Sequence, residues 1–237
     1  MAGQGSDDVT RARRAVAEAA VAMVEDGMRL GLGTGSTAAL FVDALGARVA
    51  EGLTVTGVPT SAATAEQAGR LGIPLASLDD LAPLDVTFDG ADEIDGALGL
   101  IKGGGGALLR EKLVASASRR LVVLGDWNKR VETLGRFALP VEIVRFGAGT
   151  TEAAIRGVLD AQGLSGAVVR RTRDGAAFVT DEGHEIVDLH LGRISEPAWL
   201  ADALVAVPGV VETGLFLGLA STALIGRPDG TVETLGR

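Results

Sequence analysis

The sequence contains no cysteine and only two histidines, His184 and His190. The absence of cysteine excludes disulfide bonds, thiolate metal sites and a cysteine nucleophile. Two histidines exclude a three-histidine zinc centre, and a Ser-His-Asp triad would have to use one of the two. Both lie far along the chain from the motifs described below, so we interpret them as structural or surface residues.

Positive charge and long apolar runs are also scarce. The chain has 22 Lys and Arg against 31 Asp and Glu, a formal net charge of −9, which argues against nonspecific nucleic-acid binding because such binding uses basic patches. A phosphate group would therefore have to be held by a local cluster of residues. Uncharged stretches such as 52–65 and 213–226 are shorter than the about 20 apolar residues of a membrane-spanning helix. We expect a cytoplasmic protein without a signal peptide or membrane contact.

Strands alternate with helices over the first part of the chain, which implies parallel pairing. The predicted strands are 28–32, 53–58, 73–76, 84–88 and 121–124, and the predicted helices are 9–26, 36–49, 61–71 and 107–118. The sequence therefore predicts an α/β fold with a doubly wound, mostly parallel, Rossmann-like sheet.

The order of elements changes near Pro140. Strands are predicted at 141–144, 168–171, 177–180, 186–191 and 210–216, and helices at 150–162 and 197–206. Apart from the additional strand at 177–180, this is the βαββαβ order of a ferredoxin-like α+β domain. We predict a catalytic α/β domain of residues 1–137 plus 209–237, with an inserted smaller α+β domain of residues 138–208; the last strands, 223–225 and 232–235, return to the main sheet.

The first segment with candidate chemistry is GTGST, residues 33–37, between a strand and a helix. Glycine lets the backbone approach a ligand closely, and a helix N-terminus offers N–H groups and partial positive charge. The segment lacks the Gly-Lys-Ser/Thr of a Walker A loop, and Ser36 stands where G-x-G-x-x-G has its third glycine. It predicts either a cradle for a small phosphate or a tight turn whose hydroxyls cap the helix.

The second segment, DGADEID at 89–95, follows a predicted strand. Three interpretations remain open from the residues alone: binding of a hard cation, acid–base chemistry between crowded carboxylates, and recognition of sugar hydroxyls. The spacing is not that of an EF-hand loop. We assign a function to Asp89 and Asp92, which flank a Gly-Ala pair, and predict that Glu93 and Asp95 belong to an acidic surface loop.

The third segment is Lys102 followed by four glycines and a helix that carries Glu111. The N–H groups of such a loop can face an oxyanion, with the ammonium beside it, and Glu111 is a candidate general base. The alternative is a flexible hinge before an exposed, charged helix face. Among other cations, Arg13 and Arg14 lie on the first helix, and Lys129 follows a strand at the edge where such sheets bind ligands.

Taken together, the segments GLGTGSTA, FDGADEID, KGGGGALLREK and GDWNK resemble ribose-5-phosphate isomerase, type A, in their order and spacing. The resemblance extends over nearly the whole chain. It implies an aldose–ketose isomerase that interconverts D-ribose 5-phosphate and D-ribulose 5-phosphate in the non-oxidative pentose phosphate pathway. It also implies no metal and no organic cofactor, a small sugar phosphate as ligand, and a homodimer or homotetramer.

The resemblance also assigns roles to individual residues. It implies a Glu111 base, an Asp89 proton shuttle for ring opening, and a Lys102 that stabilises a cis-enediolate. Residues matching the family's substrate-binding loops are Thr34, Gly35, Ser36, Thr37, Asp89, Gly90, Ala91, Asp92, Lys102, Gly103, Gly104, Gly105 and Lys129. One departure is visible: Arg13 stands nearest to where the family often has a phosphate-binding lysine, and Arg is not a neutral replacement for Lys.

Three other functions remain as alternatives. An amino-sugar phosphate deaminase would release ammonia, and a CoA transferase would use its glutamate as a nucleophile and form a trappable thioester. A non-catalytic sugar-phosphate sensor usually carries a DNA-binding helix-turn-helix module. We expect none here, because only about eight residues precede the first predicted helix.

Overall fold

The computed structural model describes residues 2–236, with side chains described from residue 5 onward. The described chain forms two compact units. The first comprises Met1–Ala91, Arg110–Arg130 and Gly218–Arg237, and the second comprises Asp92–Leu109 and Val131–Leu217. The domain boundaries predicted at 138 and 208 stay a prediction. Within residues 2–236, no helix combines the length and apolar composition needed to cross a membrane.

The first unit is built on a six-stranded sheet in the order β15-β14-β6-β3-β1-β2. Neighbouring strands are parallel except β14 and β15, which are antiparallel. The predicted doubly wound, mostly parallel sheet is therefore confirmed. Its strands are β1 (Arg29–Leu32), β2 (Thr56–Pro59), β3 (Val86–Gly90), β6 (Leu121–Asp126), β14 (Ala220–Gly226) and β15 (Val232–Gly236).

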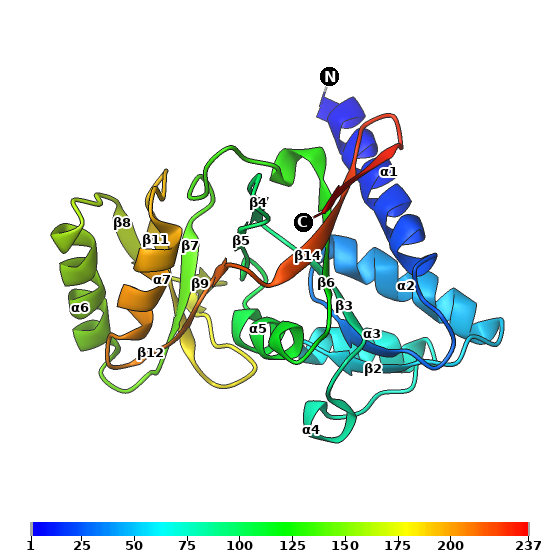
Figure 1. Ribbon diagram of the computed structural model, residues 1–237. Coiled ribbons are helices and arrows are strands. Elements are labelled where there is room, and N and C mark those ends of the chain that lie inside the picture. Colours follow the sequence, from blue (N-terminus) through cyan, green and yellow to red (C-terminus); the bar gives the residue numbers. More distant parts are fainter. Residues whose placement is uncertain (1, 237) are drawn as a thin grey trace. The chain divides into compact units, whose positions relative to one another are not determined.

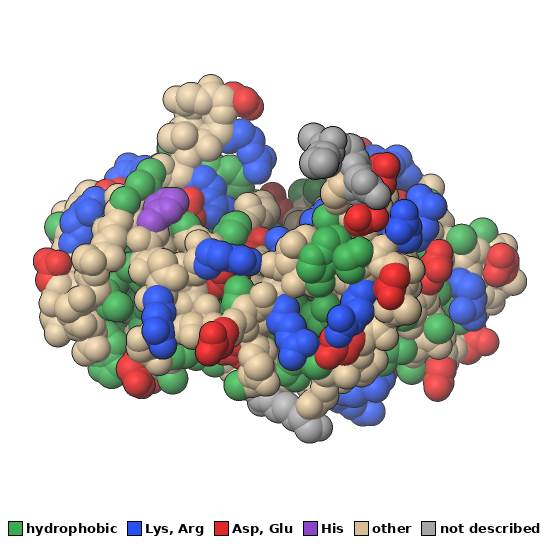
Figure 2. Space-filling model, turned by 90° about the horizontal axis from the view of Figure 1, so that it is seen from above, with side chains coloured by type: hydrophobic (Ala, Val, Ile, Leu, Met, Phe, Trp, Pro, Cys, Tyr) green, Lys and Arg blue, Asp and Glu red, His purple; other side chains and the backbone are tan. Residues whose placement is uncertain are grey.

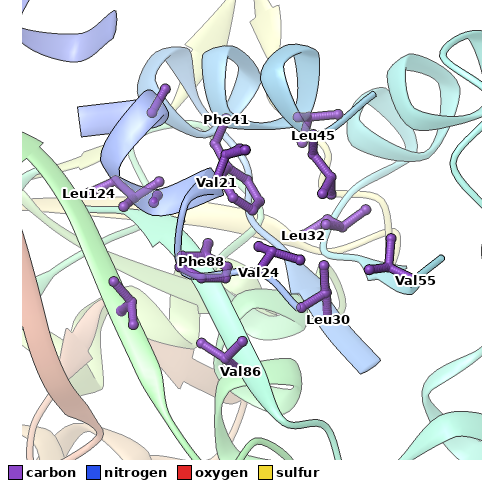
Figure 3. Packing of buried hydrophobic residues seen from close by; sticks show 14 of the residues in the cluster. Val21, Val24, Leu30, Leu32, Phe41, Leu45, Val55, Val86, Phe88 and Leu124 are labelled. Carbon is purple, nitrogen blue, oxygen red and sulfur yellow. The ribbon is translucent and has the colours of Figure 1, made fainter. Parts of the chain in front are cut away.

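Helices α1 (Ala2–Val21) and α2 (Ser36–Ala50) pack against each other and against one face of this sheet (Figure 1). Side chains alternate along a strand, so Leu30 and Leu32 point into this core while Gly31 faces the other side. Figure 3 shows the packing, in which the rings of Phe41 and Phe88 lie 4.5 Å apart between centroids. A core of this kind holds the ends of β1 and β3 in place.

The remaining helices of the first unit connect or flank these strands. Ser61 caps α3 by accepting the backbone N–H of Thr64 at 3.1 Å, as a serine at a helix N-cap is expected to do. On the face of the sheet opposite α1, Val114 of α5 lies close to Gly31, where a Cβ would sit 2.7 Å from its methyl carbon. These helices are α3 (Ala62–Arg70), α4 (Leu78–Leu81), α5 (Leu108–Ser116) and the 3₁₀ helix η1 (Trp127–Lys129).

The second unit contains a four-stranded antiparallel sheet in the order β12-β7-β11-β8. Helices α6 and α7 cover one face (Figure 1), where Val141, Ile143, Val187 and Leu189 form the core with them. The chain order βαββαβ with this strand order confirms the ferredoxin-like prediction. The elements are β7 (Leu139–Ile143), α6 (Ala148–Ala161), β8 (Ala167–Arg170), β11 (Glu185–His190), α7 (Pro197–Val205) and β12 (Val210–Thr213).

Several predicted strands differ in detail. The strand expected over 210–216 breaks at Gly214, where a Cβ would lie 2.3 Å from the carbonyl oxygen of Lys102, and the chain passes from β12 to β13. The strand expected over 177–180 is replaced by the β9–β10 hairpin and one isolated bridge, and the strand expected over 73–76 by another isolated bridge. The small strands are β4 (Glu93–Ile94), β5 (Leu100–Ile101), β9 (Thr172–Arg173), β10 (Ala176–Ala177) and β13 (Leu215–Phe216).

Candidate active site

In the first unit, strand β1 lies between β2 and β3. The connections that leave β1 and β3 therefore diverge at the carboxyl edge of the sheet, and ligands of open α/β sheets bind at such a point. The GTGST segment follows β1, and Asp89 stands near the end of β3. The topology thus brings two predicted site segments to one edge.

Asp89 is almost fully buried, at 1% exposure, and contacts the GTGST segment directly. Its Oδ1 accepts the backbone N–H of Thr34 at 3.1 Å and that of Gly90 at 2.7 Å. Glycine is required at position 33 because a Cβ there would lie 2.2 Å from Oδ1 of Asp89. The Asp89 carboxylate therefore fixes the position of the GTGST backbone. Gly90 and Ala91, which follow Asp89, are half-buried.

The side chain of Thr34 belongs to a cluster of hydroxyls that the sequence did not reveal. Its Oγ1 lies 2.7 Å from Oγ1 of Thr60 and donates to Oγ of Ser61 at 2.8 Å. Thr64 Oγ1 donates to the carbonyl of Gly33 at 3.0 Å. The sequence signal for this cluster is a strand followed by Thr60, Ser61 and a helix. Because β1 and β2 pair in parallel, the ends of both strands lie at one edge of the sheet.

The N-terminus of α2 follows this loop. Gly35 is the N-cap residue, with φ 118°, a left-handed conformation that favours glycine, and no side chain caps the helix there. Ser36 is exposed and Thr37 is buried. A 15-residue helix with an uncapped N-terminus presents N–H donors and partial positive charge, which suits an anion.

Arg13 of α1 reaches the end of β6. Its Nε donates to Oδ2 of Asp126 at 2.9 Å, and Asp126 is 1% exposed. Oδ1 of the same carboxylate accepts the N–H of Asn128 at 3.1 Å, in the turn that carries the half-buried Lys129. Asp126 therefore holds the guanidinium of Arg13 beside the turn that carries Lys129. Arg14, the neighbour of Arg13 in sequence, is exposed.

Glu111 lies in the first turn of α5 and is 4% exposed. An ionisable side chain is rarely buried without hydrogen bonds or charged partners. Glu111 is therefore not part of an exposed, charged helix face, which was the alternative interpretation of this position. A buried carboxylate of this kind is suited to proton transfer with a bound ligand rather than with bulk water.

In the second unit, Lys102 follows β5 and is 2% exposed. Its backbone N–H donates to the carbonyl of Gly214 at 2.9 Å, and its Nζ lies 5.5 Å from the centroid of the Phe216 ring. The aromatic face stabilises an ammonium that has left water. The lysine is thus held by the small sheet of β4, β5 and β13.

The glycines after Lys102 form a turn in which Gly106 N–H donates to the carbonyl of Gly103 at 3.0 Å. Asp92 joins this turn, because its Oδ2 accepts the N–H of Gly104 at 2.7 Å. Gly104 and Gly105 are exposed. The structure therefore brings Asp92 and the glycine loop together within the second unit, as it brings Asp89 and Thr34 together within the first.

The prediction that Glu93 belongs to an acidic surface loop is wrong. Glu93 is fully buried, and its two oxygens accept the N–H groups of Gly135 and Phe137, both at 2.7 Å. Asp95, which is half-buried, closes a local turn by accepting the N–H groups of Ala97 and Gly99 at 2.8 and 2.7 Å. The acidic segment thus consists of carboxylates that each hold backbone amides.

No cation site emerges from this segment. Over residues 2–236, no three His, Asp or Glu side chains come together in a way that could hold a metal ion. His184 contacts Glu142 with its Nδ1 at 3.0 Å and His190 is exposed, so neither lies in the loops described above. On the face shown in Figure 2, acidic and basic side chains are interspersed, which leaves phosphate binding to local groups.

Comparisons with known proteins agree on one family. The family model described as ribose 5-phosphate isomerase A (phosphoriboisomerase A) matches residues 56–230. The chain is 58% identical over 229 residues to ribose-5-phosphate isomerase A of Methylorubrum extorquens, covering 95% of this chain and 97% of that protein. These matches extend across both units.

Solved structures give the same result. The structure of ribose 5-phosphate isomerase A from Methanocaldococcus jannaschii matches with a TM-score of 0.87 and 40% identity, covering 95% of this chain and 98% of that one. A D-ribose-5-phosphate isomerase in complex with phospho-erythronic acid matches with a TM-score of 0.88 and 34% identity, covering 97% and 99% of the two chains. The likeness therefore includes sequence, length and fold.

Proposed function

Since the chain belongs to the ribose-5-phosphate isomerase A family, an aldose–ketose isomerase family of the pentose phosphate pathway, we propose that Glu111 is its general base. The observation that carries the proposal is the burial of Glu111, at 4% exposure in the first turn of α5. A positioned base contributes about 10²–10⁴-fold to such a reaction. The residue also matches the family's KGGGGALLREK segment.

The reaction begins with opening of the sugar ring, for which Asp89 is the proton shuttle. Its Oδ1 is occupied by two backbone N–H groups, so its position is defined before substrate arrives. Glu111 then removes the proton from C2 of the aldehyde form, which gives a cis-enediolate. The hydroxyl proton then passes from O2 to O1 of the enediolate, and Glu111 returns the first proton to C1, which gives the ketose.

The enediolate carries negative charge on oxygen, and its stabilisation falls to Lys102 and to backbone N–H groups of the glycine loop, residues 103–105. Preorganised donors of this kind act where charge develops and need no reorganisation during the reaction. Lys102 is 2% exposed, so its charge is little screened by water. Asp92, which holds Gly104, belongs to the same binding loop.

The phosphate of the substrate is assigned to the loop Thr34–Thr37, together with Arg13 and Lys129. The uncapped N-terminus of α2 supplies N–H donors, and the two cations lie at the end of β6. Gly90 and Ala91 contact the sugar through their backbone. A relative is described in complex with phospho-erythronic acid, a phosphorylated sugar acid, which supports a sugar phosphate as the ligand of this site.

Two further proposals are supported only by family membership. We propose that the protein acts in the cytoplasm and assembles as a homodimer or homotetramer. Sedimentation or light scattering of the purified protein measures the second directly.

The function is tested by incubating the protein with ribose 5-phosphate in excess EDTA and following ketose formation. Wild type and Glu66→Gln, whose glutamate forms an exposed pair with Arg70 of α3, are expected to turn over equally. Glu111→Gln is expected to lose nearly all turnover while still binding phospho-erythronic acid. Near-normal turnover by Glu111→Gln would remove this residue from the role. Absence of conversion by folded wild type would contradict the isomerase itself.

A further inference from the structure

Arg171 follows β8, and its guanidinium joins two parts of the second unit. Its Nε and Nη2 donate to the two carboxylate oxygens of Asp188 on β11 at 2.9 and 2.5 Å. Its Nη1 donates to the carbonyl of Gly103 at 2.7 Å and to that of Gly104 at 3.3 Å. We propose that Arg171 is a positioning residue that orients the N–H groups of the glycine loop for catalysis, and that Asp188 holds Arg171 in place.

The geometry of the peptide bond explains how a contact with carbonyls positions N–H groups. A trans peptide is planar, with its C=O and N–H pointing in opposite directions. The carbonyl of Gly103 shares a peptide with the N–H of Gly104, and the carbonyl of Gly104 shares one with the N–H of Gly105. By drawing both carbonyls toward itself, Arg171 turns both N–H groups away from itself.

The two N–H groups then have different uses. That of Gly104 donates to Asp92 at 2.7 Å, which ties the loop on its other side. The N–H of exposed Gly105 has no protein acceptor among residues 2–236. Gly105 therefore offers the donor that a developing oxyanion of the substrate can use.

Charge adds to orientation. The guanidinium is permanently protonated, and a charged donor on a carbonyl polarises the peptide, which strengthens the hydrogen bond made by the N–H at its other end. The Arg171 side chain is 14% exposed, so solvent screens this effect only in part. Asp188 offsets the charge and fixes the plane of the guanidinium through a bidentate pair.

The ring of Phe178 packs against Gly106, at the end of the glycine loop. Phe178 is 8% exposed, and a Cβ on Gly106 would lie 2.3 Å from its Cζ. The guanidinium of Arg171 lies 5.8 Å from the centroid of the same ring. Both ends of the loop therefore depend on the segment that begins with Arg171, so loosening of this segment is expected to loosen the loop.

The chain supplies a matched control. Arg170, the preceding residue, also pairs with carboxylates, Glu152 at 2.5 Å and Glu185 at 3.3 Å. Its bonds hold β8 to other parts of the second unit and not to the glycine loop. Comparing the two arginines separates positioning of the loop from general stabilisation of the unit.

The experiment compares Arg171→Ala with Arg170→Ala by kinetics with ribose 5-phosphate and by amide hydrogen exchange of residues 102–107. For Arg171→Ala we expect kcat to fall by about tenfold to a hundredfold, as when a catalytic group is misplaced by about 1 Å, with a smaller change in KM and faster exchange in the loop. Arg170→Ala is expected to retain wild-type kcat and loop exchange. Asp188→Asn, which preserves the side-chain shape, is expected to give a smaller fall in kcat.

The inference rests on the proposed function of the glycine loop, and the two can fail separately. Failure of wild type to isomerise ribose 5-phosphate would refute the function, while loop exchange would still test the contact. Unchanged loop exchange in Arg171→Ala and Asp188→Asn would refute the positioning role. So would a lower melting temperature accompanied by unchanged kcat of the folded protein.

Discussion

The carboxylate of Asp89 accepts the backbone N–H of Thr34 at 3.1 Å, although 55 positions separate the two residues. The bond joins the loop after β1 to the end of β3. It therefore couples the segment assigned to phosphate with the residue assigned to ring opening, and a change in one loop is expected to displace the other.

Gly33→Ala tests this coupling. The new methyl group would lie 2.2 Å from Oδ1 and 2.5 Å from Cα of Asp89, so side chain and backbone must both move. We expect kcat/KM to fall by about 10²-fold and the free energy of unfolding to fall by about 1–3 kcal/mol. Steady-state kinetics and urea denaturation measure the two effects.

Gly157→Ala is the control for that substitution. Gly157 lies inside α6 and is exposed, and a Cβ there would meet no atom within 4 Å outside its own stretch of helix. We expect unchanged kinetics and a stability gain of up to about 1 kcal/mol, since alanine favours helix over glycine. Wild-type kinetics in Gly33→Ala would contradict the coupling.

Arg13→Ala tests the assignment of Arg13 to phosphate. A charge-assisted hydrogen bond contributes about 1.5–3 kcal/mol, so KM for ribose 5-phosphate is expected to rise on the order of tenfold to a hundredfold, with kcat less affected. Arg14→Ala, at the exposed neighbouring position, is expected to leave KM unchanged.

Arg13 also pairs with buried Asp126, so its removal is expected to lower stability as well. Arg13→Lys retains a positive charge and distinguishes the two roles. If Arg13→Ala and Arg13→Lys lower the melting temperature and leave KM at the wild-type value, Arg13 serves only Asp126.

Much of this arrangement could be predicted from the sequence, because its signals are local. The glycines of GTGST and of the loop after Lys102 occur beside strand and helix patterns within a few residues, and glycine is the residue expected where the chain turns tightly before a helix N-terminus that can receive an anion. The alternation of strands and helices likewise predicted both sheets. These features needed no knowledge of distant contacts.

The features that were missed depend on residues far apart in the chain. Glu93 was expected at the surface, but its partners are the amides of Gly135 and Phe137, 42 and 44 positions away. Gly214 breaks a strand because the backbone of Lys102 approaches it. A residue's own neighbours in sequence carry no signal for such contacts, so only the fold reveals them.

The pH dependence of stability provides a prediction independent of function. The pKa of Asp85 lies below its ordinary value because the backbone N–H of Arg29 donates to Oδ2 at 2.8 Å and the positive charges of Arg29 and Arg119 lie nearby; together these outweigh the effect of burial. A lowered pKa stabilises the folded state at pH above the unfolded value of about 3.9. This stabilisation is lost as pH falls through the folded pKa.

Asp85→Asn is therefore expected to be less stable than wild type at neutral pH, with the difference shrinking as the pH falls below about 4. Chemical denaturation of both proteins from pH 7 to pH 3 at one ionic strength measures it. A difference in unfolding free energy that stays constant over this range would show that Asp85 stabilises the fold by packing rather than by charge.

The central claim is that isomerisation proceeds by proton transfer through the buried carboxylate of Glu111. The most direct measurement follows deuterium by NMR, starting from ribose 5-phosphate labelled at C2 in ordinary water. Proton transfer through Glu111 predicts progressive loss of the label to solvent as substrate and product interconvert, because a carboxylate exchanges its proton between turnovers. Complete retention of deuterium at C1 and C2 after prolonged turnover at equilibrium would mean that hydrogen moves directly between the carbons, and would contradict the account.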